Sequence, residues 1–155
     1  WLFSARDKKM KLLKIKYQIL IWILPITVVL DQVTKTFIVK RFTLHEMLPV
    51  IPGYFDITRI HNTGAAFGML ANADPMIRIP FFIIVPLTAL GMIAYFLKTL
   101  PDNKRWSAVA LALILSGALG NLIDRAIYGY VVDFLYFSWK HEYFFPAFNV
   151  ADSAI

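Results

Sequence analysis

Three aspartates stand in or next to stretches of sequence that are otherwise apolar. Asp124 and Asp133 lie within GNLIDRAIYGYVVDF, and Asp152 lies within FNVADSAI. An ionisable side chain at membrane depth is costly and indicates function. Two carboxyl groups held together share a proton, so one can activate a water while the other protonates a leaving group. We expect Asp133 and Asp152 to form such a pair, although spacing alone favours solvated or helix-capping aspartates.

An Asn-x-x-Asp pattern occurs twice, at Asn121–Asp124 and at Asn149–Asp152. Residues three or four apart share a helix face, so Arg125 joins the first pair. Each asparagine could hydrogen-bond the aspartate of its own motif and orient it. The alternative, at least as well supported for Asp124, is a structural ion pair in which Arg125 neutralises it.

Two further polar motifs lie nearer the N-terminus. DQVTK places Asp31 and Lys35 four residues apart, which predicts a structural ion pair on one helix face. NTGAAFG begins at Asn62 and has the small residues of a turn in which the backbone comes close to something. Composition does not distinguish a substrate from a neighbouring helix as that partner.

The residues argue against several other chemistries. His45-Glu46 and His141-Glu142 resemble half of a zinc-binding helix motif, but no second histidine follows either pair. The sequence has no cysteine, no phosphate-binding glycine loop and no nucleophile-elbow serine. We therefore do not expect a zinc hydrolase.

The elements that must position these groups are membrane spans. Hydrophobic residues make up 59% of the chain, which exceeds the usual share in a soluble domain. Residues 79–97 and 106–123 carry no charge, and each is close to the length that crosses a bilayer. A first span is expected at about residues 17–39, interrupted by DQVTK.

The basic residues predict the orientation of these spans. The net charge is +6, but the positive charges do not form a face for nucleic acid. Residues 98–105 carry three positive charges, and six more cluster at the N-terminus, which makes both segments cytoplasmic. Residues 42–76 and 128–146 then face outward. The N-terminal cluster comprises Arg6, Lys8, Lys9, Lys11, Lys14 and Lys16.

The predicted fold class is an all-α polytopic membrane protein with a small β-rich cap. Residues 54–60 (YFDITRI) alternate loosely between β-branched or aromatic and other residues, which favours a short strand in the first outer segment. A fourth span would begin near residue 148 and be cut short, giving a four-helix bundle with a truncated last span. Residues 1–9 are interpreted as an added or upstream extension, and residues 10–155 as a single membrane-embedded domain.

The four motifs together resemble a known family. DQVTK, NTGAAFG, GNLIDR…GYVVDF and FNVADSAI occur in the order and approximate spacing of the bacterial lipoprotein signal peptidases, also called signal peptidase II. The resemblance covers the chain from about Leu30 to its C-terminal end. It implies an aspartic endopeptidase of the inner membrane that removes the signal peptide of a diacylglyceryl-modified prolipoprotein, just before the lipidated cysteine, without metal or cofactor.

The resemblance also implies roles for individual residues. Asp133 and Asp152 fall on the catalytic pair, and five other residues fall on supporting and substrate-contacting positions. The N-terminus would be cytoplasmic and the active site would lie near the periplasmic face, under a β-rich cap. The implied partners are the prolipoprotein and membrane lipid, with no nucleic acid and no required oligomer. The five supporting residues are Asn62, Asn121, Asp124, Arg125 and Asn149.

Two functions of other classes compete with proteolysis. A transporter or channel subunit could relay protons along the aspartates and the arginine, but such proteins often carry repeats that this sequence lacks. A membrane chaperone could bind clients on the outer segment, but it would not need two aspartates at matched depth. Cleavage of a lipidated peptide by the purified protein, without metal, distinguishes all three.

Overall fold

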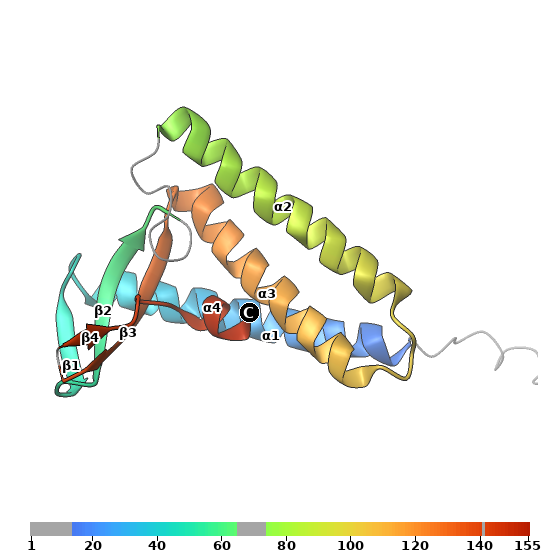
Figure 1. Ribbon diagram of the computed structural model, residues 1–155, viewed down its shortest axis with the longest axis horizontal. Coiled ribbons are helices and arrows are strands. Elements are labelled where there is room, and N and C mark those ends of the chain that lie inside the picture. Colours follow the sequence, from blue (N-terminus) through green and yellow to red (C-terminus); the bar gives the residue numbers. More distant parts are fainter. Residues whose placement is uncertain (1–13, 65–73, 141) are drawn as a thin grey trace, which may run out of the picture.

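Three long helices form the body of the computed structural model, which describes residues 14–64, 74–140 and 142–155. They are α1 (Ile15–Arg41), α2 (Pro75–Thr99) and α3 (Arg105–Tyr128). Within the described residues, these three helices are long and apolar enough to cross a membrane. The chain is therefore a multi-pass helical membrane protein (Figure 1). The N-terminal extension and most of the NTGAAFG motif lie outside the described residues.

Each helix extends a few residues beyond the span predicted from the sequence. Pro25 lies inside α1 and Pro80 and Pro86 lie inside α2, as spanning helices tolerate. Asp74 caps the start of α2 by accepting a hydrogen bond from the backbone of Met76 at 2.8 Å. The end of α3 is a glycine in the left-handed conformation, Gly129 at φ 76°.

A four-stranded antiparallel sheet covers one end of the helices. Its strands are β1 (Met47–Ile51), β2 (Phe55–Asn62), β3 (Val131–Trp139) and β4 (Tyr143–Phe144), in that spatial order. The strand predicted at residues 54–60 corresponds to β2. β3 was not predicted, although VVDFLYF has the β-branched and aromatic residues of a buried strand. The sheet therefore draws on the α1–α2 connection and on the segment between α3 and the C-terminal helix, not on the first connection alone.

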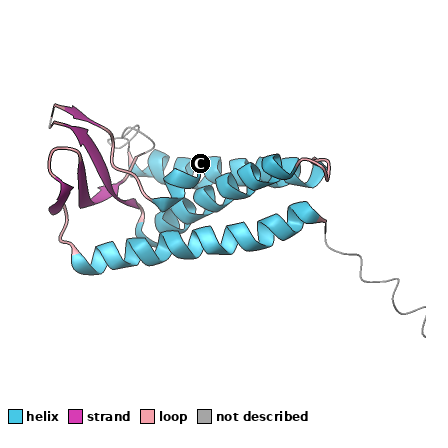
Figure 2. Cartoon of the chain, turned by 90° about the horizontal axis from the view of Figure 1, so that it is seen from below, coloured by secondary structure: helices cyan, strands magenta, loops and turns pink. Residues whose placement is uncertain are grey.

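The sheet packs on the C-terminal end of α1, which defines what we call the sheet end of the molecule (Figure 2). Ile38, Val132 and Phe134 form a buried apolar cluster that joins α1 to β3. Two consecutive backbone N–H groups of β3, those of Phe134 and Leu135, donate to the carbonyl of Phe148 at 3.0 and 2.9 Å. These contacts hold the segment that leads into α4 (Val150–Ala154) against the sheet.

The opposite end of α1 meets the connection between α2 and α3, residues 100–104, which we call the turn end. Lys16 is 4% exposed and donates to the carbonyl oxygens of Lys98 and Leu100, both at 2.7 Å. These carbonyls lie at the C-terminus of α2, where helix geometry leaves acceptors unpaired. Lys16 therefore joins α1 to the end of α2.

The fourth span expected near residue 148 corresponds in the described residues to α4, a helix of five residues. It packs on α1 and α3 (Figure 1). Large apolar side chains cover the outer surfaces of the three long helices, as lipid contact requires. On α1 these exposed residues include Trp22, Ile26, Val29, Val33 and Phe37.

Candidate active site

Asp152 is held by the first turn of α4. Asn149 is the N-cap residue, and its side-chain oxygen accepts from the backbone N–H of Asp152 at 2.9 Å. In return, Asp152 Oδ2 accepts from the backbone N–H of Asn149 at 3.2 Å. This reciprocal capping box holds one oxygen of the carboxylate, Oδ2, and leaves Oδ1 to other contacts. Asp152 thus has the helix-capping role considered as the alternative, and it lines a cavity as well.

Asp133 lies on β3, with its side chain directed toward the same place. The residue is 2% exposed, and its two oxygens accept from Asn149 Nδ2 at 2.7 Å and Asn62 Nδ2 at 3.0 Å. Burial, followed by repulsion from the nearby charge of Asp152, raises the pKa of Asp133 to about 7. Asn149 therefore bridges two acidic residues, one of which readily holds a proton at neutral pH.

The asparagines are paired differently from the sequence interpretation. Asn121 donates to Asp152 Oδ1 at 2.7 Å, although it belongs to the motif of Asp124. The side-chain oxygen of Asn149 accepts from Asp152 in its own motif. Its side-chain amide hydrogens, however, are donated to Asp133 and Asn121. Each asparagine therefore reaches a carboxylate on another element, a pairing that depends on how α3, β3 and α4 pack.

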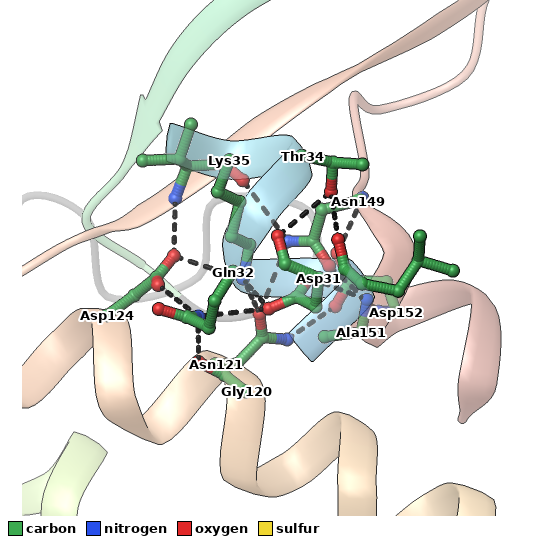
Figure 3. Close-up of polar contacts among 12 residues, drawn as sticks. Asp31, Gln32, Thr34, Lys35, Gly120, Asn121, Asp124, Asn149, Ala151 and Asp152 are labelled. Atoms are coloured by element: carbon green, nitrogen blue, oxygen red, sulfur yellow. Dashed lines mark hydrogen bonds and ion pairs between the residues drawn. The ribbon is translucent and has the colours of Figure 1, made fainter. Parts of the chain in front are cut away.

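Asp124 belongs to a buried ion cluster rather than to an Asp–Arg pair. Its Oδ2 lies 3.0 Å from Lys35 Nζ and accepts from the backbone N–H of Val132 at 3.1 Å. Its Oδ1 accepts from Gln32 at 2.9 Å. The expected Asp124–Arg125 ion pair is not formed within the described residues: Lys35 from a different helix makes the short ion pair, and Arg125 acts on Asp124 only through longer-range electrostatics (Figure 3).

The predicted ion pair between Asp31 and Lys35 is present at 2.8 Å, and it is part of the same cluster. Asp31 also accepts from the backbone N–H of Ala151 at 2.9 Å, which connects α1 to the start of α4. Gly120 permits this approach, because a Cβ there would lie 2.7 Å from Asp31 Oδ2. The pair is thus next to the candidate site, as Figure 3 shows.

Arg125 lies on the side of α3 that faces the cavity. Its guanidinium donates to the carbonyl of Gly64 at 3.1 Å and lies over the ring of Phe82, 5.0 Å from the centroid. Arg125 therefore connects α3 with α2 and with the segment after β2. Among the described residues, no other hydrogen bond of this guanidinium is present, and its planar fork lines the cavity.

An open cavity of about 1000 Å³ brings most of the predicted site residues together. Asp133, Asp152, Asn62, Asn121 and Arg125 all line it. Asn149 is fully buried behind it, and Asp31, Lys35 and Asp124 form the ion cluster. Gln32, which donates to Asp124, was not predicted from the sequence, although it directly follows Asp31 in DQVTK. The other wall is largely apolar and includes Ile60, Val131, Phe145, Phe148 and Ile155.

No group of three or more metal-ligating side chains occurs among the described residues. Within the same part of the chain, every buried side-chain nitrogen and oxygen has a hydrogen-bond partner. The polar groups at this site therefore satisfy one another through amides, carboxylates and one ammonium.

A multi-pass membrane protein whose cavity joins a buried carboxyl group, that of Asp133, and a more exposed one, that of Asp152, to an apolar wall belongs to the class of integral membrane enzymes. The family model described as signal peptidase (SPase) II matches residues 23–155, and the chain belongs to this family. The resemblance inferred from the four motifs is thereby confirmed, and membership makes the protein a peptidase.

Similar proteins support this assignment. A relative from Syntrophotalea carbinolica is 47% identical over 140 residues, covering 90% of this chain and 85% of the relative. Another from Geobacter sulfurreducens is 54% identical over 129 residues, covering 83% and 79%. Both are called lipoprotein signal peptidase. A bacterial membrane enzyme solved by the in meso method at 2.3 Å resolution has a TM-score of 0.76 and 36% identity, covering 87% of this chain and 79% of that one.

Proposed function

We propose that this protein is an aspartic endopeptidase that removes signal peptides from diacylglyceryl-modified prolipoproteins, cutting just before the lipidated cysteine. Two of its relatives are called lipoprotein signal peptidase. The observation that carries the proposal is the bridge through Asn149, which donates to Asp133 at 2.7 Å and, through its backbone N–H, to Asp152 at 3.2 Å. Metal and cofactor have no part in the proposed reaction.

The raised pKa of Asp133 supports a division of roles within the pair. With a pKa of about 7, Asp133 carries the shared proton, while Asp152 accepts two N–H groups and acts as the base. Asp152 takes a proton from water, whose oxygen adds to the scissile carbonyl as Asp133 protonates the carbonyl oxygen. When the C–N bond breaks, Asp152 returns its proton to the leaving amine and Asp133 recovers one from the diol.

The apolar wall of the cavity could hold the lipid part of the substrate, which would account for two aspartates next to the hydrocarbon of the membrane. A diacylglyceryl group is apolar and stays at membrane depth, so the bond next to its cysteine is held near the membrane surface. Phe145, Phe148 and Ile155 line the cavity beside the two aspartates and provide contacts for such a group. All proposed site residues come from one copy of the chain, so an oligomer is not required. Substrate and membrane lipid are the proposed partners, and nucleic acid is not among them.

The proposed location is the bacterial inner membrane, with the turn end cytoplasmic and the sheet forming a periplasmic cap. The basic N-terminus and the basic connection between α2 and α3 support this orientation. In it, α4 begins the fourth helix of the bundle. Because the chain has no cysteine, Asn103→Cys should resist an impermeant thiol reagent in intact cells, whereas Glu142→Cys should react. The reverse labelling pattern would overturn the orientation.

The decisive experiment for the chemistry is to remove each ionisable group of the pair without changing its shape. Asp133→Asn and Asp152→Asn should each lower the cleavage rate of a diacylglyceryl-modified prolipoprotein at least about 100-fold, in the presence of a chelator. The double variant should lose hardly more, because groups that act as a unit are not additive. A chelator-sensitive reaction, or substantial turnover by either variant, would contradict the aspartic mechanism.

A further inference from the structure

The geometry points to Lys35 as a positioning residue that orients Asp152 through the side-chain amide of Asn121. This inference rests on the proposed role of Asp133 and Asp152. It gives a function in the reaction to a lysine that the sequence analysis placed in a purely structural ion pair. Lys35 forms no hydrogen bond or ion pair with either aspartate of the pair within the described residues, although its charge lowers the pKa of Asp133 through space. Any effect on the direction of the Asp152 carboxylate therefore has to pass through other side chains.

Lys35 is 3% exposed, and three acceptors surround its ammonium group. They are Asp31 Oδ2 at 2.8 Å, Asp124 Oδ2 at 3.0 Å and Asn121 Oδ1 at 3.0 Å. An ammonium has three N–H donors and no acceptor. All three donors therefore have a partner, and a buried lysine with two carboxylates is held in place.

The absence of an acceptor on Lys35 determines which way the Asn121 amide points. The amide atom facing an ammonium has to be the oxygen, because an NH₂ group there would bring donors together. The NH₂ group consequently faces the other way, and Nδ2 donates to Asp152 Oδ1 at 2.7 Å. The flipped amide would bring its oxygen against the carboxylate of Asp152 and remove this hydrogen bond.

A second contact supports the same direction but does not replace Lys35. Asn149 Nδ2 donates to Asn121 Oδ1 at 3.2 Å, while also donating to Asp133 at 2.7 Å. The shorter and charged contact from Lys35 is the stronger constraint on Asn121. Lys35 also holds Asp31, which accepts from Ala151 N–H immediately before Asp152. Two routes thus lead from this ammonium to the same carboxylate.

The chain contains a matched control for this role. Lys16 lies on the same helix and is buried to nearly the same extent, at 4% exposure against 3% for Lys35. Its short contacts are backbone carbonyl oxygens at the turn end. Replacing Lys16 therefore tests the loss of a buried lysine without disturbing the route to Asp152.

The first test compares Lys35→Met with Lys16→Met in the full chain, using a diacylglyceryl-modified prolipoprotein as substrate. Both variants should lower the thermal midpoint. Only Lys35→Met should lower kcat, by about 10–100-fold with a nearly unchanged KM, since small misplacements of a catalytic group cost up to about 100-fold. An equal loss of kcat in both variants, or none in Lys35→Met, would overturn the inference.

The second test separates orientation from stability. Lys35→Met/Asp124→Asn removes one of the carboxylates left without a counter-charge and should recover part of the lost thermal midpoint, while kcat stays low. In addition, Lys35→Met should cost clearly less activity in an Asn121→Ala background than in the wild type, because the route through Asn121 is already interrupted and only the one through Asp31 remains. If the Lys35→Met/Asp124→Asn variant regained the wild-type kcat together with stability, Lys35 would act only on the fold. Fully additive losses of activity in Lys35→Met/Asn121→Ala would show the same.

The outcome also distinguishes this inference from the proposed function. If Asp133→Asn and Asp152→Asn are inactive while Lys35→Met is fully active, the pair stands and the positioning role fails. If either Asn variant cleaves at a rate close to the wild type, the aspartic mechanism itself fails, and the inference fails with it.

Discussion

Helix α1 buries one lysine near each end, and the two have opposite surroundings. At the turn end, Lys16 donates to the carbonyl oxygens of Lys98 and Leu100. At the sheet end, Lys35 lies among the carboxylates of Asp31 and Asp124 and the amide of Asn121. Burial is the same, but only Lys35 is connected to groups that can do chemistry. Burial of a charge therefore does not by itself identify a functional site; the partners do.

The difference lies in what remains when the lysine is lost. Without Lys16, two carbonyls lose a donor, which typically costs about 1–3 kcal/mol. Without Lys35, two buried carboxylates lose their counter-charge, which typically costs about 3–5 kcal/mol. The sheet end is thus built from interdependent charges, and the turn end from a helix cap. We expect changes at the sheet end to affect activity and changes at the turn end to affect stability alone.

The largest expected effect is at Gly117, where α4 packs on α3. A Cβ at this position would overlap the carbonyl oxygen of Ala151 and lie 2.7 Å from Ile155 Cγ1. Gly117→Ala should displace the first turn of α4 and lower the cleavage rate roughly 100-fold or more. Gly91→Ala is the control, since a Cβ there meets nothing within 4 Å. Full activity in Gly117→Ala would mean that the position of α4 is not critical.

Arg125 should show an intermediate effect at the sheet end. Arg125→Ala loses the contact to Gly64 and the guanidinium that lines the cavity, and should lower kcat/KM by about 10–100-fold. Arg125→Lys keeps the charge without the planar fork and should lose less. The thermal midpoint should change little, because Lys35 and not Arg125 makes the short ion pair with Asp124. A large loss of stability in Arg125→Ala would contradict this account of the ion cluster.

The Asp133→Asn variant should reveal a pH-dependent gain in stability. The folded-state pKa of about 7 lies above the usual 3.8. The wild type therefore loses stability as pH rises from about 4 to 7, as the carboxyl ionises against its surroundings. The variant lacks this loss, so its thermal midpoint should exceed that of the wild type by roughly 2–6 °C at pH 8 and by less at pH 5. A constant difference across this range would argue against a raised pKa.

The smallest effect is expected at the surface of the turn end. Lys14 lies 3.1 Å from Asp102, and both side chains are more than half exposed, at 58% and 54%. Ion pairs of this kind contribute about 0–1 kcal/mol. Lys14→Ala should therefore leave both the cleavage rate and the thermal midpoint nearly unchanged. A loss approaching that of Lys16→Met would show that the exposed pair, and not the buried cap, holds this end together.

Much of the protein follows from the sequence alone. The long apolar stretches predict the three helices, because a chain in lipid has to satisfy its backbone hydrogen bonds within each helix. The Asp31–Lys35 ion pair follows from helix geometry, since residues four apart are neighbours on any helix. The order and spacing of four motifs indicate the family, and the matched family model confirms it.

Only the tertiary structure determines which polar group meets which. Asn121 and Asp124 are neighbours in one motif and both contact Lys35, yet Asn121 also donates to Asp152 whereas Asp124 accepts from the backbone of Val132. β3 becomes a central strand because β2, from a distant segment, pairs with it and brings Asn62 to Asp133. Local spacing determines contacts within a helix, whereas hydrogen bonds between elements depend on packing, and packing is set by the whole chain.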